Sequence, residues 1–356
     1  MAGDPRHLFF GDYLEVQLDK KTRNSQAHSI LRLLFSLASL VTLTFVLNKP
    51  FKQFPSLGGL LNPFTGVWRP SANTHFSNLM LIGLDAPVEV TISSDRVKHV
   101  FASNDHDLYF IQGYLEAMDR LWQMDFLARV ASGRLSEIVG RRGLEQDLLF
   151  LNFGIPDAAQ DSLDLAIRDA QTKLALDSFA EGVNAYIENL KTEDLPFEFK
   201  LLGYLPEKWT PLRTILLTKL MALQLSGRSL DLPRTRSRQR LNDSDFNDLF
   251  PLQFDYQDSI IPPGASQVGI RAIQSPEKLY RAHLDFDIPR PQPHPGNGSN
   301  NWAVSGKLSS TGFPILANDI HLDYSLPSIF YEIQLTSPKQ NVYGVTFPGV
   351  PGITVG

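Results

Sequence analysis

A proline- and glycine-rich segment at residues 258–298 divides this chain and constrains its fold more than any other feature. Proline fixes φ and lacks a backbone N–H, so this segment can form neither a packed helix nor a central strand. Its prolines are Pro262, Pro263, Pro276, Pro289, Pro291, Pro293 and Pro295, with Gly264, Gly296 and Gly298 among them. We therefore predict an exposed spacer, and an exposed linker is also what cleavage of a chain requires.

The region before the spacer begins with two strand patterns and a long helical one. Residues 88–92 alternate and are β-branched, and residues 99–102 are a candidate partner strand. Apolar residues at helical spacing then predict a helix that starts at Asp105 or Asp107 and runs to about residue 130.

Further helices are predicted between this one and the spacer. One covers 157–189 with a break near Thr172, and another covers 211–226, with Thr210 as N-cap and proline in the first turn. Residues 228–240 are rich in arginine and are expected to form a solvated face. Beyond the spacer the pattern changes to successive strands, predicted at 301–304, 314–317, 328–335 and 342–346.

Charged residues interrupt the apolar face of the first long helix. Glu116 and Arg120 stand four residues apart, a spacing at which they can pair. Asp119 and Arg120 admit two interpretations, members of a site or buried ion pairs that join helices. Charge beside apolar faces usually needs a partner, so we adopt the ion-pair interpretation and assign neither residue to catalysis.

The N-terminus has the layout of a secretory signal or signal-anchor. Residues 33–47 are apolar except for serine and threonine, and Lys20, Lys21, Arg23 and Arg32 precede them. Bulky residues at 45–47 leave no small-x-small cleavage site, which favours an uncleaved anchor with its basic side inside. The run is short for a full span, and a buried helix of the fold is the alternative.

We therefore predict a polar cytosolic tail at 1–29, an anchor at 30–48 and a linker at 49–84, with the remainder facing the periplasm or the cell exterior. The formal net charge of −5 gives no reason to expect a nucleic-acid partner. The chain has no cysteine, which excludes disulfides and thiolate metal sites. No Walker A motif or dinucleotide fingerprint occurs in the sequence.

The five residues Gly298-Ser299-Asn300-Asn301-Trp302 carry the most specific chemistry. If the Gly298–Ser299 bond were cut, Ser299 would supply a nucleophilic hydroxyl and its own α-amine as the base. An α-amine has a pKa of about 8, close to working pH, where a general base is most effective. The alternative is ordinary turn chemistry, in which such a serine only bonds to nearby backbone.

These residues and several other blocks, in this order, resemble the penicillin acylase (penicillin amidase) family of N-terminal-nucleophile hydrolases from about residue 88 to 356. The blocks lie at 113–125, 133–137, 298–302, 314–322, 328–332 and 344–352. The resemblance implies an α+β fold, the Ntn-hydrolase four-layer αββα sandwich, here incomplete. It implies an α-chain-like region at 85–257, a spacer at 258–298 that some members remove, and the start of a β-chain-like nucleophile region at 299–356.

The resemblance also implies roles for single residues. Ser299 is the expected nucleophile and Gly298–Ser299 the self-cleavage site. In two branches of the family, the cephalosporin and homoserine-lactone acylases, the histidine that matches His321 contacts the amine of the nucleophile; a structural histidine that bonds loop carbonyls is the alternative. Asn301 and Asp319 are expected to be polar supports. The expected acyl pocket comprises Met221, Leu225, Ser226 and Phe347, with ordinary core packing as the alternative for the first three.

The function implied is hydrolysis of the amide bond of N-acyl substrates through an acyl-enzyme, in an α/β heterodimer formed by self-cleavage. The family's oxyanion-hole residues and most of its calcium carboxylates have no match in this chain, and Asp231 matches an upstream ligand poorly. We therefore expect no metal site from these residues, with calcium possible only by resemblance. The alternative function is a catalytically incomplete fragment that acts as a folding or binding unit, or needs a partner chain for the missing part.

Overall fold

The computed structural model describes residues 11–49, 56–62, 66, 79–226, 231–251, 256 and 297–356. Most of the predicted spacer and much of the predicted linker lie outside these residues. The chain divides into two compact units, Met1–Lys219 with Ser325–Gly356, and Leu220–Tyr324. We call them the first and the second unit and describe each by itself.

Helix α1, Gly11–Leu47, contains the apolar N-terminal segment. It begins well before residue 30, so part of the predicted polar tail is helical too. The stretch His28–Leu47 has the length and composition of a membrane-crossing helix or a signal sequence, and none of it is buried. The alternative of a buried core helix is therefore wrong for this segment.

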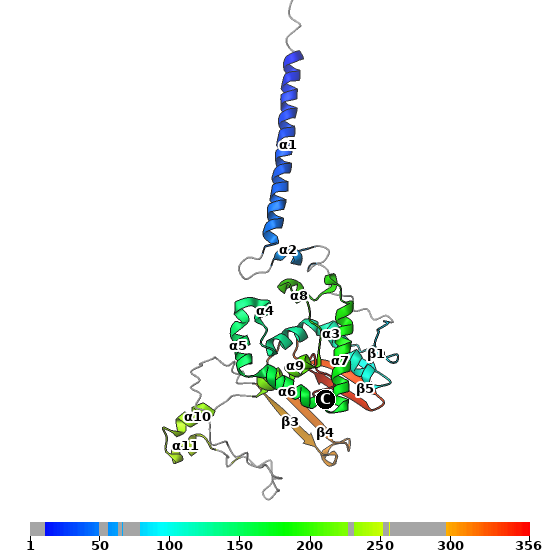
Figure 1. Cartoon of the computed structure of the whole chain (residues 1–356), viewed down its shortest axis with the longest axis vertical. Helices are drawn as coiled ribbons and strands as arrows, with labels where there is room; N and C mark the ends of the chain where they lie inside the picture. The colour runs from blue at the N-terminus through cyan, green and yellow to red at the C-terminus, as the bar shows by residue number, and fades with distance from the viewer. Residues whose placement is uncertain are drawn as a thin grey trace, which may run out of the picture. The chain divides into compact units, whose positions relative to one another are not determined.

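The first unit contains a four-stranded sheet that joins segments from both sides of the spacer (Figure 1). Its strands are β1 (Glu89–Ile92), β2 (Lys98–Phe101), β5 (Tyr331–Ser337) and β6 (Gln340–Thr346), in the order β1-β2-β5-β6. β1 and β2 pair antiparallel, as do β5 and β6, whereas β2 and β5 run parallel. Burial alternates along β5, because one face of the strand packs against the core.

Helix α3, Asp105–Ala131, confirms the first long helix predicted from the apolar spacing. Its N-cap is Asn104, whose side chain accepts a hydrogen bond from the Asp107 N–H, so the predicted caps at Asp105 or Asp107 are wrong. Asn104 has the extended backbone that an N-cap requires, while both aspartates already lie in the first turn. The helix is kinked at Arg120, which has φ −137° and ψ 15°.

Helix α7, Ala170–Asn189, packs against α3 (Figure 1). One glycine of each helix, Gly113 and Gly182, lies at the contact. A Cβ on Gly113 would lie 2.2 Å from the Phe179 carbonyl oxygen, and a Cβ on Gly182 would lie 1.8 Å from the Phe110 oxygen. The two backbones therefore approach more closely than any larger residue permits. Around this contact lie the largest fully buried side chains of the first unit, which include Trp209, Phe110, Phe179 and Phe199.

The predicted 157–189 helix is divided into α6, Ile155–Ala166, and α7. Asp169 caps α7 by accepting from the Thr172 N–H and hydroxyl, so the break lies slightly before Thr172. The remaining helices are α2 (Leu57–Leu60), α4 (Ser136–Val139), α5 (Leu144–Asn152), α8 (Phe197–Leu202), α9 (Pro211–Leu225), α10 (Asp231–Arg238) and α11 (Asp243–Leu249). Short 3₁₀ turns occur at Gly140–Gly143, Thr192–Asp194 and Gly306–Leu308.

The second unit contains α10, α11, the end of α9 and an antiparallel hairpin. The hairpin strands are β3, Gly298–Val304, and β4, Ile315–His321, and their residues are largely exposed. Helix and sheet are thus mixed in the described residues, while the four-layer αββα sandwich remains a prediction.

Candidate functional site

The predicted cleavage bond lies at the start of β3, at one end of the hairpin. Gly298 pairs with His321, and Ser299 pairs with Ile320. The Ser299 hydroxyl donates a hydrogen bond of 2.6 Å to the Gly298 carbonyl oxygen. The hydroxyl therefore lies beside the carbonyl group that an acyl shift would attack.

His321 lies opposite Gly298, and the pleat places its side chain on the other face of the hairpin from the Ser299 hydroxyl. Directly paired residues share a face and successive residues alternate, so Ser299 groups with Ile320, and His321 groups with Gly298 and Asp319. The His321 Nε2 is 2.7 Å from an Asp319 oxygen. This pairing brings the imidazole to the backbone next to Ser299 rather than to its hydroxyl.

The predicted acyl-pocket residues have different surroundings. Met221 is buried, whereas Leu225 is 54% exposed, and the Ser226 hydroxyl donates to the Leu223 carbonyl at the end of α9. In the first unit, Phe347 is half-buried and stacks on Phe330, with centroids 5.4 Å apart and planes at 26°. The burial of Met221 fits core packing, whereas the exposure of Leu225 does not, and the assignment of these residues to an acyl pocket stays a prediction.

The turn after Phe347 is held by side chains from α3 and α9. The Gly349 N–H donates to Glu116 Oε2 (2.8 Å), and the Gly352 N–H donates to Gln112 Oε1 (2.8 Å). The Gln112 amide donates to the carbonyls of Val350 (3.3 Å) and Gly352 (3.1 Å), and to Glu116 Oε1 (2.8 Å).

This contact corrects one prediction and adds two residues that sequence reasoning missed. Glu116 does not pair with Arg120, whose guanidinium donates to Gln123 and to the Ser328 carbonyl. Glu116 and Gln112 are both fully buried. Burial raises the pKa of Glu116 to about 8, while the bonds from Gly349 and Gln112 act in the opposite direction. The available signal was two hydrogen-bonding side chains four residues apart on an otherwise apolar helix face.

Asp119 forms an ion pair, as predicted, but its partner lies on a strand rather than on a helix. Lys98 of β2 is paired with the Asp119 carboxylate, which also accepts from the Tyr331 hydroxyl at 2.8 Å. The same hydroxyl accepts from the Lys98 ammonium at 3.1 Å. The triangle ties α3 to β2 and β5 and buries all three groups partly or fully, which is a structural role.

A second charged network joins α3, α9 and the segment before α9. Asp125 is 1% exposed and pairs with Arg129 at 2.9 Å and with Arg213. Glu207 accepts from Arg129, Arg134 and Arg213 at 2.7–2.9 Å. The network borders a cavity of about 390 Å³. Its charges are largely paired with one another, so we assign it to stability.

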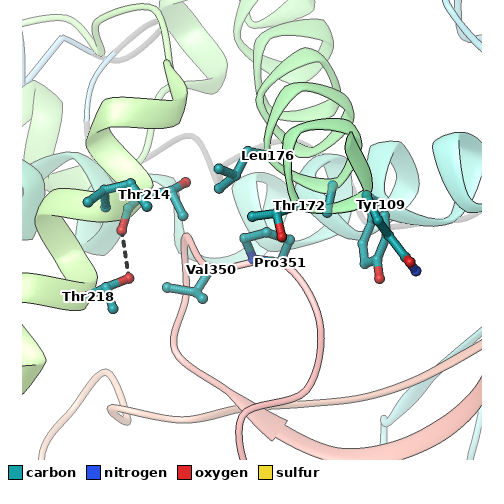
Figure 2. A pocket seen from close by; sticks show the side chains of 10 residues that line it. Tyr109, Thr172, Leu176, Thr214, Thr218, Val350 and Pro351 are labelled. Atoms are coloured by element: carbon teal, nitrogen blue, oxygen red, sulfur yellow. Dashed lines mark hydrogen bonds between the residues drawn. The ribbon is translucent and has the colours of Figure 1, made fainter. Parts of the chain in front are cut away.

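Another cavity, of about 320 Å³, lies beside the Gly349–Gly352 turn (Figure 2). Its lining contains no charged residue and consists of Tyr109, Gln171, Thr172, Ala175, Leu176, Thr214, Ile215, Thr218, Val350 and Pro351. The hydroxyl of Thr214 donates to the Gly349 carbonyl at 2.8 Å, and that of Thr218 donates to the Thr214 carbonyl at 3.1 Å. The turn therefore forms part of the cavity wall.

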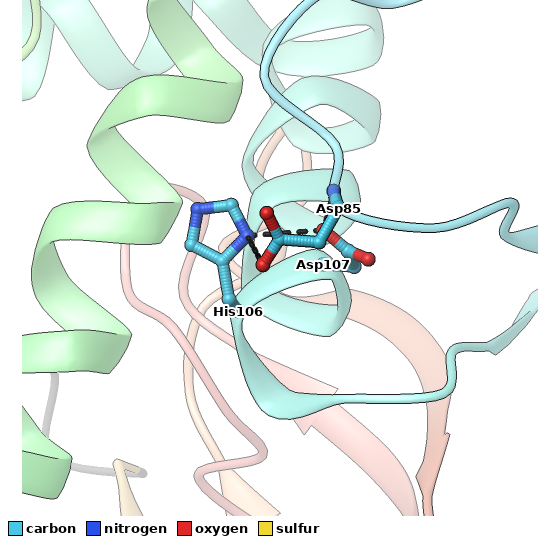
Figure 3. Close-up of side chains that lie close together, drawn as sticks. All are labelled: Asp85, His106 and Asp107. Carbon is cyan, nitrogen blue, oxygen red and sulfur yellow. Dashed lines mark hydrogen bonds and ion pairs between the residues drawn. The ribbon is translucent and has the colours of Figure 1, made fainter.

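Asp85, His106 and Asp107 bring three potential metal ligands together (Figure 3). The buried Asp107 carboxylate already accepts from the N–H groups of Asp85 and Ala86, the Asn104 amide and His106 Nδ1, at 2.7–3.0 Å. Burial disfavours its charge, but these bonds outweigh burial and lower its pKa. A cation would have to displace these donors, so the cluster serves to fasten the 85–86 loop to the start of α3.

Comparisons with known proteins give one consistent result. The family model described as penicillin amidase matches residues 87–356. The penicillin acylase 2 proenzyme of Pseudomonas sp. (strain SE83) is 32% identical over 288 residues, which are 77% of this chain and 35% of that protein. The acyl-homoserine lactone acylase QuiP of Pseudomonas aeruginosa is 31% identical over 267 residues, 70% of this chain and 29% of that protein.

A solved structure, the thermostable penicillin G acylase from Alcaligenes faecalis, is 26% identical with a TM-score of 0.43, over 49% of this chain and 97% of that chain. This chain spans about a third of the length of the two curated relatives.

Proposed function

The chain belongs to the penicillin amidase family, and from this premise we propose that it contributes the nucleophile of an acylase that hydrolyses the amide bond of N-acyl substrates. The observation that carries the proposal is the Ser299 hydroxyl, 2.6 Å from the oxygen of the carbonyl it would attack. The family's relatives include a protein named as a proenzyme, which supports activation by cleavage.

In the proposed maturation, the Ser299 Oγ attacks the Gly298 carbonyl carbon and transfers its proton to the departing Ser299 nitrogen. The Gly298–Ser299 amide bond becomes an ester, and water hydrolyses that ester to a Gly298 carboxylate and a free Ser299. The freed α-amine then takes the hydroxyl proton, directly or through one water, when Ser299 attacks a substrate amide. The α-amine passes that proton to the substrate nitrogen as the substrate C–N bond breaks, the amine product leaves, and water then hydrolyses the ester on Ser299 to release the acyl group as a carboxylic acid.

We place His321 beside the freed amine, where Asp319 orients its ring. Met221, Leu225, Ser226 and Phe347 are proposed to contact the acyl group. Candidate substrates are β-lactam side chains, acyl-homoserine lactones and N-acyl amino acids. The α/β heterodimer and an anchored enzyme outside the cytosol belong to the same proposal, whereas calcium stays an expectation from the family resemblance alone.

The test is mass spectrometry of the expressed chain, which should yield a fragment that begins at Ser299. Ser299→Ala should abolish both this fragment and acylase activity of the assembled protein, because the hydroxyl is required for both steps. Ser305→Ala, an exposed serine after the same strand, is the matched control and should be processed normally. Cleavage at Gly298–Ser299 in the Ser299→Ala chain would refute self-cleavage.

The alternative is a folding or binding unit without turnover. It is favoured by apolar side chains that the hairpin leaves exposed, such as Trp302 at 52% and Leu316 at 67%. This alternative predicts an uncut chain that binds a partner chain, so the same mass measurement separates the two functions.

A further inference from the structure

We propose that Glu116 and Gln112 are positioning residues: the buried Glu116 carboxylate, together with Gln112, holds the Gly349–Gly352 turn, and uptake of a proton by Glu116 releases part of that hold. The consequence for catalysis rests on the proposed function, in which Phe347 at the head of this turn contacts the acyl group. The hold itself does not depend on that function.

The turn has a backbone hydrogen bond of its own, from the Val350 N–H to the Phe347 carbonyl at 2.9 Å, but its two glycines allow other conformations. Gly349 has φ +101° and Gly352 has φ +85°, conformations that glycine adopts easily and leaves easily. Yet the N–H and C=O groups of both glycines bond to Glu116, Gln112 and Thr214. A Cβ on Gly349 would lie 2.3 Å from Leu217 Cδ1, so the turn is also packed tightly on α9.

Protonation weakens this set of bonds. Both Glu116 oxygens accept from N–H groups, one from Gly349 and one from the Gln112 amide. A hydrogen bond to a charged acceptor is roughly twice as strong as one between neutral groups, so a neutral carboxyl group binds both donors less strongly. The Gln112 amide cannot turn over to accept the new proton, since its own oxygen accepts from the Gly352 N–H. The bonds from Glu116 to the turn and to Gln112 are therefore weaker after protonation.

The charged groups around Glu116 place its titration within reach of ordinary buffers. Complete burial and Asp119 of α3 disfavour the charged form of the Glu116 carboxyl group, whereas Lys98 of β2 favours it. The pKa of the Tyr331 hydroxyl of β5 is raised well above its ordinary value. Burial is the largest of these influences and raises the pKa of Glu116 to about 8. The turn should therefore tighten as the pH rises through this value and loosen as it falls.

The experiment is hydrogen exchange of the full chain, followed by mass spectrometry of a peptide that covers 347–352. Pro348 and Pro351 carry no amide hydrogen, so few amides contribute to this peptide. Protection factors, corrected for the intrinsic effect of pH, are measured from about pH 6 to about pH 10, around the Glu116 pKa of about 8. We expect protection of the Gly349 and Gly352 amides to rise about tenfold, as for one hydrogen bond to a charged group.

Three variants separate this mechanism from general loosening. Glu116→Gln should abolish the pH dependence. Thr214→Val should lower protection at every pH and preserve the dependence, because it removes the hydroxyl that donates to the Gly349 carbonyl and accepts from the Trp209 indole N–H, and leaves Glu116 and Gln112 in place. Asp147→Asn is the matched control, a buried carboxylate that accepts from the N–H groups of Leu135 and Ser136; it should leave the turn unchanged.

Protection that stays flat with pH in the unaltered chain would overturn the proposal, and so would a pH dependence that survives Glu116→Gln. Flat protection in the unaltered chain is measured without any variant, so the proposal can still be refuted if a variant fails to fold. In a processed, active protein, Glu116→Gln should raise KM for the acyl substrate more than it lowers kcat. An uncut Gly298–Ser299 bond would refute the proposed function but would not change the conclusion drawn from the hydrogen-exchange experiment.

Discussion

Replacing Gly182 by alanine should destabilise the first unit by about 2 kcal/mol, because it forces α3 and α7 apart. The added Cβ would lie 1.8 Å from the Phe110 carbonyl oxygen and 2.7 Å from its carbon. Both are backbone atoms and cannot rotate away, so α7 has to move by roughly 1 Å out of a close-packed contact. Overpacking of this kind costs up to about 3 kcal/mol, and the better helix propensity of alanine returns about 1 kcal/mol.

The assay is thermal unfolding of the full chain in mild detergent, followed by circular dichroism. A loss of about 2 kcal/mol corresponds to a fall in Tm of roughly 4–8 °C for a domain of this size. Glu188→Ala, an exposed residue of the same helix, is the control and should change stability by less than about 0.5 kcal/mol.

A double variant tests the reasoning further. Gly113→Ala brings a Cβ to 2.2 Å from the Phe179 oxygen at the same contact. Once the helices have separated to accommodate one alanine, the second alanine should destabilise the protein less. The loss of unfolding free energy in the double variant should therefore be smaller than the sum of the losses in the two single variants. An unchanged Tm for Gly182→Ala, or full additivity in the double variant, would refute the close-approach argument.

Two further predictions concern the charged network of the first unit. Asp125→Asn should cost about 3–5 kcal/mol in urea unfolding, since it leaves the buried Arg129 and Arg213 without this carboxylate; a loss below about 1 kcal/mol would contradict the assignment. For Glu207, the bond from Arg134 lowers the folded pKa to about 2 from the ordinary 4.5, despite burial. Its stabilisation is therefore complete above about pH 4.5 and is lost as the pH falls towards 2. Glu207→Gln should flatten the free energy of unfolding over that interval, and Glu188→Gln, at an exposed position, should not.

Local patterns predicted the secondary structure well where one period dominated. The apolar spacing after residue 105 predicted α3, and the alternating run at 88–92 predicted β1 to within one residue. The errors occurred where neighbouring residues compete for one role. Asn104, Asp105 and Asp107 are all acceptable caps, and only the backbone conformation of Asn104 decides among them.

Contacts between distant segments could not be predicted. Glu116 lies 233 residues before Gly349, and its partner Gln112 lies 240 residues before Gly352. The sequence offered a nearer cation, Arg120, at a suitable helical spacing. In the fold, Arg120 sits at the kink of α3 and bonds to the Ser328 carbonyl instead.

The sequence by itself identified the candidate nucleophile and the proposed cleavage bond, because the proposed self-cleavage involves two adjacent residues and needs no distant partner to be named. The sequence also predicted most helices and strands, because the spacing of apolar residues that distinguishes them can be read within a single segment. Only the tertiary structure decided that strands from both sides of the spacer share one sheet, and which polar groups meet inside it. A buried carboxylate takes whichever donors the packed backbone brings within reach, and that backbone is arranged by the burial of apolar surface from the whole unit.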